Sequence, residues 1–252
     1  MSTPNTAAAA PPPDTLHRTL IVLDGAKEEV RTMLQDVHLR HTFIMRMFKV
    51  AIESNAPVPD AWTFGAPLEL AETPSPRADI GILYAFDTAG MKVRVMVQSR
   101  QAPDAYQVGQ LAAQGTAVHT WTVPTSFDKG QVLAFDLQGN TVELRTRESA
   151  RRLRPIANRA GKLAWIARQG QAHGFEMVGE PTFGWSENLH SEIKSPPRSE
   201  LDHGSRGFIV TVTRYRGSLQ VTDPELFKAA QATGIGHSKA YGCGLLMVNP
   251  VS

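Results

Sequence analysis

The order of the expected strands and helices is the feature of this sequence that most narrows its fold. Runs of β-branched and apolar residues predict strands. These runs lie at 16–23, 80–86, 91–98 and 117–123 in the first half, and at 131–137, 208–215, 217–221 and 245–248 in the second. Helices are expected at 36–51, 161–169 and 223–232. A strand, a helix and a strand pair, used twice, predict an α+β fold of two ferredoxin-like domains in tandem, each an antiparallel sheet with helices on one face.

Composition divides the chain into three parts. Residues 1–14 are rich in alanine and proline and lack the basic region that begins a secretory signal, so we expect a disordered tail. The two ferredoxin-like domains are expected at 15–128 and 129–252, because a new strand follows Gly130.

Glycine, proline and polar residues mark the expected connections. Turns are predicted at 87–90 and 139–140, and 217–221 is predicted to pair with the strand before it. Prolines at 57, 59 and 67 predict a loop after the first helix, and the polar stretch between 185 and 207 predicts a mobile loop.

The bulk composition is that of a globular chain. Of the 252 residues, 42% are hydrophobic and 20% are charged, and no apolar run approaches the ~18 residues of a membrane span. The single cysteine, Cys243, excludes an intramolecular disulfide and a zinc site built from several cysteines. We therefore expect a cytoplasmic protein.

A glycine-rich segment lies between the last expected helix and the last expected strand. It contains Gly234, Gly236, Gly242 and Gly244, with Lys239 between them. Such a loop suits phosphate binding through backbone N–H groups, but a helix cap followed by a tight turn would also select glycine. The pattern alone leaves both open. Its order excludes a dinucleotide-binding GxGxxG, which opens a helix, and the P-loop pattern GxxxxGK[ST] is matched nowhere.

Positive charge is concentrated between residues 131 and 170. This stretch has eight basic residues, seven of them arginine, against three acidic ones. Arginine binds phosphate well because its planar group donates two parallel hydrogen bonds. The stretch predicts a nucleic-acid contact, although a solvated basic face would have the same composition.

Segment 234–246 resembles the C-terminal signature of the CRISPR-associated CasE endoribonucleases, which belong to the type I-E system and to the repeat-associated RNA-binding superfamily. Other segments resemble this family in the same order, namely 97–99, 102–104, 162–168, 174–175, 216–219 and 221–224. The resemblance runs over most of residues 16–250.

The resemblance implies an antiviral enzyme that cleaves the CRISPR repeat hairpin and stays bound to its product. Its partners would be the repeat RNA and the other subunits of the type I-E surveillance complex, Cascade, with no membrane. It implies no cofactor and no metal, because a ribose 2′-oxygen attacks the adjacent phosphate to give a 2′,3′-cyclic phosphate and a 5′-hydroxyl. Histidine suits the proton transfers, and lysine or arginine suits the charge on the phosphorane.

The resemblance also implies catalytic residues in the first helix. The family's catalytic histidine precedes a phenylalanine by seven residues, and His41 and Phe48 fit that spacing. His38 stands where the family usually has tyrosine, on the same helix face, and could transfer a proton or stabilise charge. Arg46 stands where some relatives have a basic residue. By pattern alone His41 could instead be a core histidine, because it lies on the apolar stripe of this helix.

RNA contact is expected from the second domain, where the family presents a basic hairpin to the repeat stem, read largely through shape and phosphates. The candidate RNA-binding residues are Arg145, Arg147, Arg151, Arg152, Arg154, Arg159, Lys162, Gly234, Gly236, Lys239, Gly242 and Gly244. The family often has an Arg-x-Asn-Pro turn after the first strand of this domain, whereas residues 138–141 read Gln-Gly-Asn-Thr.

Two alternatives remain at this point. A subunit that holds the RNA without cutting it is favoured by His38 in place of tyrosine and by the altered 138–141 segment. An enzyme acting on a phosphorylated metabolite could use the glycine-rich segment, but the arginine-rich stretch argues against it.

Overall fold

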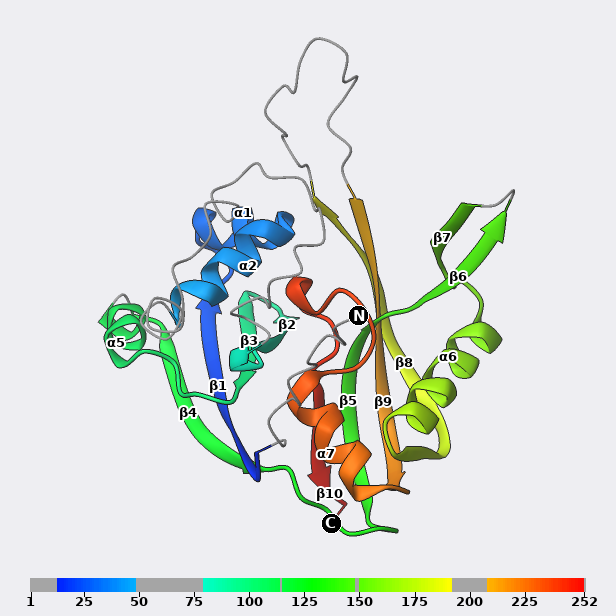
Figure 1. Ribbon diagram of the computed structural model, residues 1–252. Helices are drawn as coiled ribbons and strands as arrows, with labels where there is room; N and C mark the ends of the chain where they lie inside the picture. Colours follow the sequence, from blue (N-terminus) through cyan, green and yellow to red (C-terminus); the bar gives the residue numbers. More distant parts are fainter. Residues whose placement is uncertain (1–12, 49–78, 114, 148–149, 192–207, 252) are drawn as a thin grey trace, which may run out of the picture.

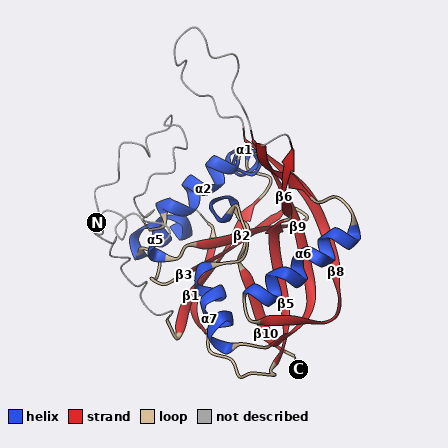
Figure 2. Cartoon of the chain, turned by 45° about the vertical axis from the view of Figure 1, so that its right-hand side comes forward, coloured by secondary structure: helices blue, strands red, loops and turns tan. Residues whose placement is uncertain are grey.

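The computed structural model describes residues 13–48, 79–113, 115–147, 150–191 and 208–251. Two four-stranded sheets and a separate two-stranded hairpin form its β-structure (Figures 1 and 2). Most of the expected N-terminal tail and the proline loop after the first helix lie outside the described residues. Among the helices of the described ranges, none combines the length and apolar character of a membrane span.

The first sheet has the strand order of a ferredoxin-like domain. Its order is β2-β3-β1-β4, and every neighbouring pair is antiparallel. The elements along the chain are β1 (Thr15–Asp24), α1 (Glu28–Gln35), α2 (Val37–Arg46), β2 (Leu83–Ala89), β3 (Lys92–Ser99), α5 (Ala105–Ala113) and β4 (Ala117–Pro124).

The second sheet repeats this order with a later set of strands, β10-β5-β9-β8. Its elements are β5 (Val132–Asn140), the hairpin β6 (Val142–Arg147) and β7 (Ala150–Pro155), α6 (Arg159–Ala172), β8 (Phe175–Ser191), β9 (Phe208–Val221), α7 (Pro224–Thr233), the 3-10 turn η2 (Lys239–Tyr241) and β10 (Leu246–Pro250). The predicted α+β fold of two tandem ferredoxin-like domains is therefore confirmed.

Buried and exposed residues alternate at the start of β3. Val93, Val95 and Val97 are buried in the core under the helices, and Lys92 and Arg94 are exposed. A strand with one face on the core buries every second side chain, so the alternation of valine with polar residues in β3 accounts for which face is buried.

The predicted turn at 139–140 is wrong. Gly139 and Asn140 end β5 and pair with Thr213 and Val212 of β9. Glycine has a packing reason at 139, because a Cβ there would lie 2.7 Å from the ring of Trp165. Turns and close packing both select glycine, so residue type alone could not separate them.

The predicted strand pair at 208–215 and 217–221 is also wrong, because β9 is one continuous strand of 14 residues. Gly217 lies in its interior as the register partner of Phe135. A Cβ at this glycine would lie 3.3 Å from the Cα of Pro181. The glycine again makes room for a neighbour rather than a turn.

Other elements differ from the expected bounds. β2 begins at Leu83 and continues to Ala89, so the turn before β3 is formed by Gly90 and Met91 rather than 87–90. β8 continues through Ser191 and takes up the first part of the expected mobile loop, and 192–207 lie outside the described residues. The sequence patterns do not predict α1 and α5.

A row of alternating charges joins the two domains. Arg214 of β9 donates to Asp87 of β2 (Nη1–Oδ1 2.7 Å) and to Asp136 of β5 (Nη2–Oδ2 2.6 Å). Arg94 and Arg216 bind the same two carboxylates, at 3.0 Å from Asp87 and 2.9 Å from Asp136 respectively. Since Arg214 is only 5% exposed, its charge depends on both acidic partners.

Two buried amide side chains add further contacts between the domains. Gln98 Nε2 donates to the carbonyl oxygen of Gln231, and Gln138 Nε2 donates to that of Phe86, both at 2.8 Å. Buried polar groups cost free energy when unpaired, so these bonds favour one docking of the domains.

Candidate functional site

Helix α2 carries the three predicted catalytic residues and lies where the two domains meet. It contacts η2 of the glycine-rich segment and β8 of the second domain. Figure 1 shows β8 and β9 rising between α2 on one side and the β6–β7 hairpin on the other. The helix expected to cut RNA and the hairpin expected to hold it are thus separated by one strand pair.

The start of α2 packs against the second domain. Val37 is 1% exposed and forms a buried cluster with Val210 and Val212 of β9 and with Cys243, next to Tyr241. This cluster fixes the first turn of the helix from the side of the second domain.

His41 follows Val37 by one helical turn, so both lie on one side of α2. Its residue is half-buried, and its Nδ1 atom is enclosed. His41 is therefore not a fully buried core histidine, the alternative that its sequence pattern allows. The backbone of His38 lies in the same helix three residues earlier.

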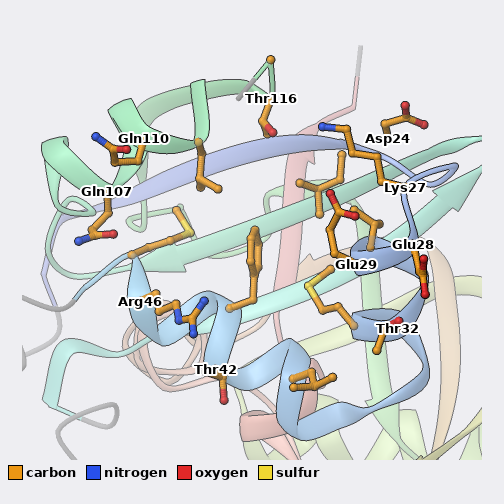
Figure 3. Close-up of a pocket in the computed structure, with 18 residues that line it drawn as sticks. Asp24, Lys27, Glu28, Glu29, Thr32, Thr42, Arg46, Gln107, Gln110 and Thr116 are labelled. Carbon is orange, nitrogen blue, oxygen red and sulfur yellow. The ribbon is translucent and has the colours of Figure 1, made fainter. Parts of the chain in front are cut away.

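Arg46 lies on a different side of α2. Five residues correspond to about 140° around a helix from His41. Arg46 instead lines an open groove of about 1010 Å³ between α1, α2 and α5 (Figure 3). In Figure 3 Arg46 and Thr42 lie on the α2 side, and Gln107 and Gln110 on the α5 side. The structure does not bring Arg46 to His41.

The four glycines of the C-terminal segment all have positive φ, from 74° to 87°. A Cβ would lie 2.7 Å from Leu83 at Gly234, 3.1 Å from Tyr84 at Gly242 and 3.1 Å from Trp165 at Gly236. Leu83 and Tyr84 belong to β2, and Trp165 belongs to α6. The segment is thus packed between both domains and needs glycine for conformation and for space.

Several backbone donors of this segment are used inside the protein. Ile235 N–H donates to Gly244 O at 2.9 Å, Gly244 N–H to Gln138 O at 2.7 Å and Tyr241 N–H to Ser238 O at 2.9 Å. The hydroxyl of Tyr84 donates to the carbonyl oxygen of Ala240. The bonds of Gly244 and Tyr84 join the segment to β5 and β2, and the other two lie within the segment. A bound phosphate could therefore use only other groups of the segment, among them the half-buried Lys239.

The β6–β7 hairpin concentrates arginine on one face. Its register pairs Arg145 with Arg152, Glu143 with Arg154 and Arg147 with Ala150. Alternation and register together place Arg145, Arg147, Arg152 and Arg154 on this face. The same face also includes Glu143, opposite Arg154, so the excess of positive charge lies toward the Arg145–Arg152 pair.

Arg154, Arg159 and Lys162 differ in their exposure and pairing. Arg154 is exposed near the end of β7, within the hairpin. Arg159 is exposed too, but its Nε donates to Glu180 at 2.9 Å and its guanidinium lies 4.9 Å from the centre of the Phe183 ring. Lys162 is half-buried in α6. Arg159 therefore already has a partner for its charge.

Cys243 shares its buried cluster with the start of α2. Burial raises the pKa of its thiol to about 12, an increase that the nearby Arg40 partly opposes. Arg40 itself is buried in α2, with its guanidinium 5.2 Å from the centre of the Phe86 ring. The thiol is thus neutral at ordinary pH, and Cys243 serves as an apolar residue where α2 packs against the second domain.

Sequence reasoning did not identify Val210, Val212 and Arg214, which contact the first domain. Their signal is visible afterwards as a period of two in β9, where two valines and then arginine alternate with Thr211 and Thr213. Such alternation says that one face is buried, but it does not say what covers that face.

A model of the CRISPR-associated protein family matches residues 16–250. The chain belongs to this family. The CRISPR-associated endoribonuclease Cse3 of Thermus thermophilus is 31% identical over 122 residues, which are 48% of this chain and 57% of that protein. The Cascade subunit CasE of Escherichia coli is 29% identical over 168 residues, 62% of this chain and 74% of that protein. The matched region thus spans a little over half of the Thermus protein.

Solved structures of the CRISPR-associated family have the same fold. Thermus thermophilus Cse3 bound to an RNA representing a pre-cleavage complex has a TM-score of 0.69 at 22% identity, over 94% of this chain and 100% of that chain. Cas6e from Escherichia coli has a TM-score of 0.59 at 16% identity, over 93% and 100%. These likenesses support the tandem fold over 93–94% of this chain and the whole of both solved chains.

The close approach at Gly244 predicts a selective loss of stability. Gly244→Ala should lower the free energy of unfolding by about 3 kcal/mol, because alanine would meet both the positive φ of 87° and the Ile235 oxygen 2.6 Å away. Gly90→Ala is the matched control, since its φ of 59° is also positive but no atom lies within 4 Å of the added Cβ, and it should cost about 1 kcal/mol. Urea unfolding measures both, and equal losses would contradict the packing argument.

The raised pKa of Cys243 predicts an inert thiol. A disulfide reagent at pH 8 should label the folded protein slowly and the urea-unfolded protein at once, because only the unfolded thiol, with a pKa near 9.0, ionises readily. Burial also raises the pKa of Tyr215 from 10.0 to about 12. Both groups stabilise the fold below their unfolded pKa values, and this contribution is lost as pH rises toward 12.

The urea midpoint should therefore fall between pH 9 and 12, and by less in Cys243→Ala. Rapid labelling of the folded wild type would show that the thiol is accessible.

Proposed function

We propose that this protein is an endoribonuclease that cleaves the hairpin of CRISPR repeat RNA and stays bound to the product as a subunit of the type I-E surveillance complex. The observation that carries the proposal is the family match over residues 16–250. The names of the curated relatives, an endoribonuclease and a Cascade subunit, support it, as does the fold shared with RNA-bound Cse3.

In the proposed reaction the 2′-oxygen of a ribose attacks the adjacent phosphate without a metal ion. The 2′-hydroxyl loses its proton, the bond from phosphorus to the 5′-oxygen breaks, and that oxygen gains a proton to leave a 5′-hydroxyl and a 2′,3′-cyclic phosphate. His41 acts in one of these proton transfers. Because its Nδ1 is enclosed, the imidazole can act on RNA only through Nε2.

Lys239 and His38 complete the proposed centre. The element η2, which contains Lys239, lies against α2, so a phosphate bound by Lys239 would be near the histidine helix. A fixed cation there stabilises negative charge on the phosphorane. His38 serves as proton partner or second cation beside His41. Arg46 faces the groove on the other side of α2 and has no part in this centre.

The arginine face of the β6–β7 hairpin is the proposed contact for the RNA stem. A double-stranded RNA stem is recognised mainly through phosphates and shape, and four arginines on one face of a hairpin suit both. Because β8 and β9 lie between this hairpin and α2, the RNA stem would cross these two strands so that its lower end reaches His41.

Two observations favour the second candidate, a subunit that holds RNA without cutting it. Histidine replaces the family tyrosine at 38, and Arg46 lines the groove on a different side of α2 from His41. The two functions differ in their product, because only the enzyme generates RNA that ends in a cyclic phosphate.

Removing the imidazole of His41 should abolish cleavage while leaving RNA binding intact. His41→Ala should slow cleavage of a cognate repeat hairpin about 10²- to 10⁴-fold, the usual contribution of general acid–base catalysis. The assay contains EDTA and follows single-turnover cleavage, with hairpin affinity measured by filter binding. His119→Ala, which removes an exposed histidine of β4 rather than of α2, is the control.

Three results would count against this assignment: loss of wild-type activity in EDTA, full activity of His41→Ala, or equal loss in His119→Ala. Stable binding of the cognate hairpin without any cyclic-phosphate product would favour the non-cleaving subunit.

The salt dependence of RNA binding should separate Arg152 from Arg159. Arg152→Gln should reduce the slope of log affinity against log salt by about one, because its register partner is Arg145 rather than a carboxylate and an arginine on a phosphate releases counterions. Arg159→Gln should change the slope less, since Glu180 already neutralises that guanidinium. Hairpin binding titrated at several salt concentrations tests this, and a larger effect at Arg159 would contradict it.

A further inference from the structure

We propose that one face of β9 sets the position of His41 relative to the RNA-binding hairpin, and so selects which phosphate is cut. Val210, Val212 and Arg214 act as positioning residues that do not touch RNA. The inference rests on the proposed function. It adds that residues of the second domain determine which RNA phosphate is cleaved.

The three residues share a face of β9 because they alternate along the strand. They are 2%, 1% and 5% exposed. Tyr215, on the opposite face, is stacked on Trp165 in the core of the second domain. One face of β9 thus builds its own domain, and the other face holds the first domain.

The upper contact of this face is with the catalytic helix. Val210 and Val212 belong to one buried cluster with Val37, the first residue of α2, and with Cys243. His41 lies one turn further along the same helix, and a helix is rigid over one turn. A change in the packing at Val37 therefore moves the His41 ring.

The lower contact is ionic. Arg214 reaches Asp87 of β2 at 2.7 Å while it also binds Asp136 of its own domain. Two contacts at different heights on one strand resist rotation as well as sliding. The first domain is thereby held in one orientation against β9.

Val212 also lies at the root of the RNA-binding hairpin. Its register partner is Asn140, the last residue of β5, and β6 begins two residues later at Val142. Asn140 Nδ2 in turn donates to Ser238 Oγ of the glycine-rich segment at 2.7 Å. One residue of β9 is thus bonded in register to the hairpin root and packed against the histidine helix.

This connection sets the distance between the bound stem and His41. When the RNA stem is bound to the arginine face, the lower end of the stem has a fixed position relative to His41. Only the phosphate that then lies beside His41 is aligned for attack. A misplacement of about 1 Å can lower a rate about 10²-fold, so looser packing should slow cleavage without weakening binding.

The test compares Val212→Ala with Val221→Ala. Both remove the same atoms from a residue of β9 that is 1% exposed, but Val221 lies in the core of the second domain. At saturating repeat hairpin, Val212→Ala should cleave about 10- to 100-fold more slowly, with cuts at neighbouring phosphates and an affinity within about threefold of wild type. Val221→Ala should cleave at the wild-type rate and position.

A second pair tests the ionic contact and covers the case in which Val212→Ala does not fold. Asp87→Asn weakens the link to Arg214, whereas Asp14→Asn removes the interdomain pair with Lys228, away from α2. The first variant should lower the rate at saturation, and the second should not. Equal losses within either pair, wild-type rates in Val212→Ala, or a loss confined to affinity would overturn the proposal.

A readout without cleavage separates this proposal from the proposed function. The imidazole resonances of His41 and their pH titration should change in Val212→Ala and Asp87→Asn and stay as in wild type in the two controls. If the wild type does not cut the hairpin, the proposed function fails, and these resonances still decide whether β9 positions His41. Unchanged resonances would refute it.

Discussion

The buried guanidinium of Arg214 is the interaction on which the arrangement of the two domains depends. Burial lowers the pKa of Arg214, but the hydrogen bonds with Asp136 and Asp87 raise it by more. The net pKa is above its ordinary value, so the group stays charged. A buried charge without partners is very costly, and one of these carboxylates belongs to the other domain. A different docking that buried Arg214 away from Asp87 would leave its charge half-compensated. The observed orientation is therefore favoured over others, whereas apolar contact alone would tolerate several orientations.

The glycine-rich segment has a structural explanation that its sequence left undecided. Positive φ angles and contacts with Leu83, Tyr84 and Trp165 account for its glycines without any ligand. The same segment is the part most like the family signature, and it lies against α2. A motif can thus be diagnostic of a family because it joins two domains. In this segment Lys239 is the side chain expected to bind RNA, and the glycines have structural roles.

Much of the fold could be predicted from sequence, and the failures have a common cause. The valines of β3 gave the correct buried face, and the order of elements predicted the duplicated domain. Gly139 was interpreted as a turn residue, and Gly217 as the start of a new strand. Both instead lie inside strands, close to Trp165 and Pro181 respectively, which come from other segments. The five-residue spacing from His41 to Arg46 correctly indicated different sides of the helix. The burial of Val212 in one cluster with Val37 could not be predicted, because it depends on how two separate domains pack and no local pattern encodes that packing.

The repeated strand order has a consequence for how such a protein could arise. If the domains are superposed by topology, β1 corresponds to β5, and α1 with α2 corresponds to α6. The short connection after β1 then corresponds to the segment that carries β6 and β7 in the second copy. The two copies thus differ at one topological position, where a short connection joins β1 to α1 but a two-stranded hairpin stands between β5 and α6. Because the hairpin forms a sheet of its own, growth of this one loop could add the proposed RNA contact without disturbing either four-stranded sheet.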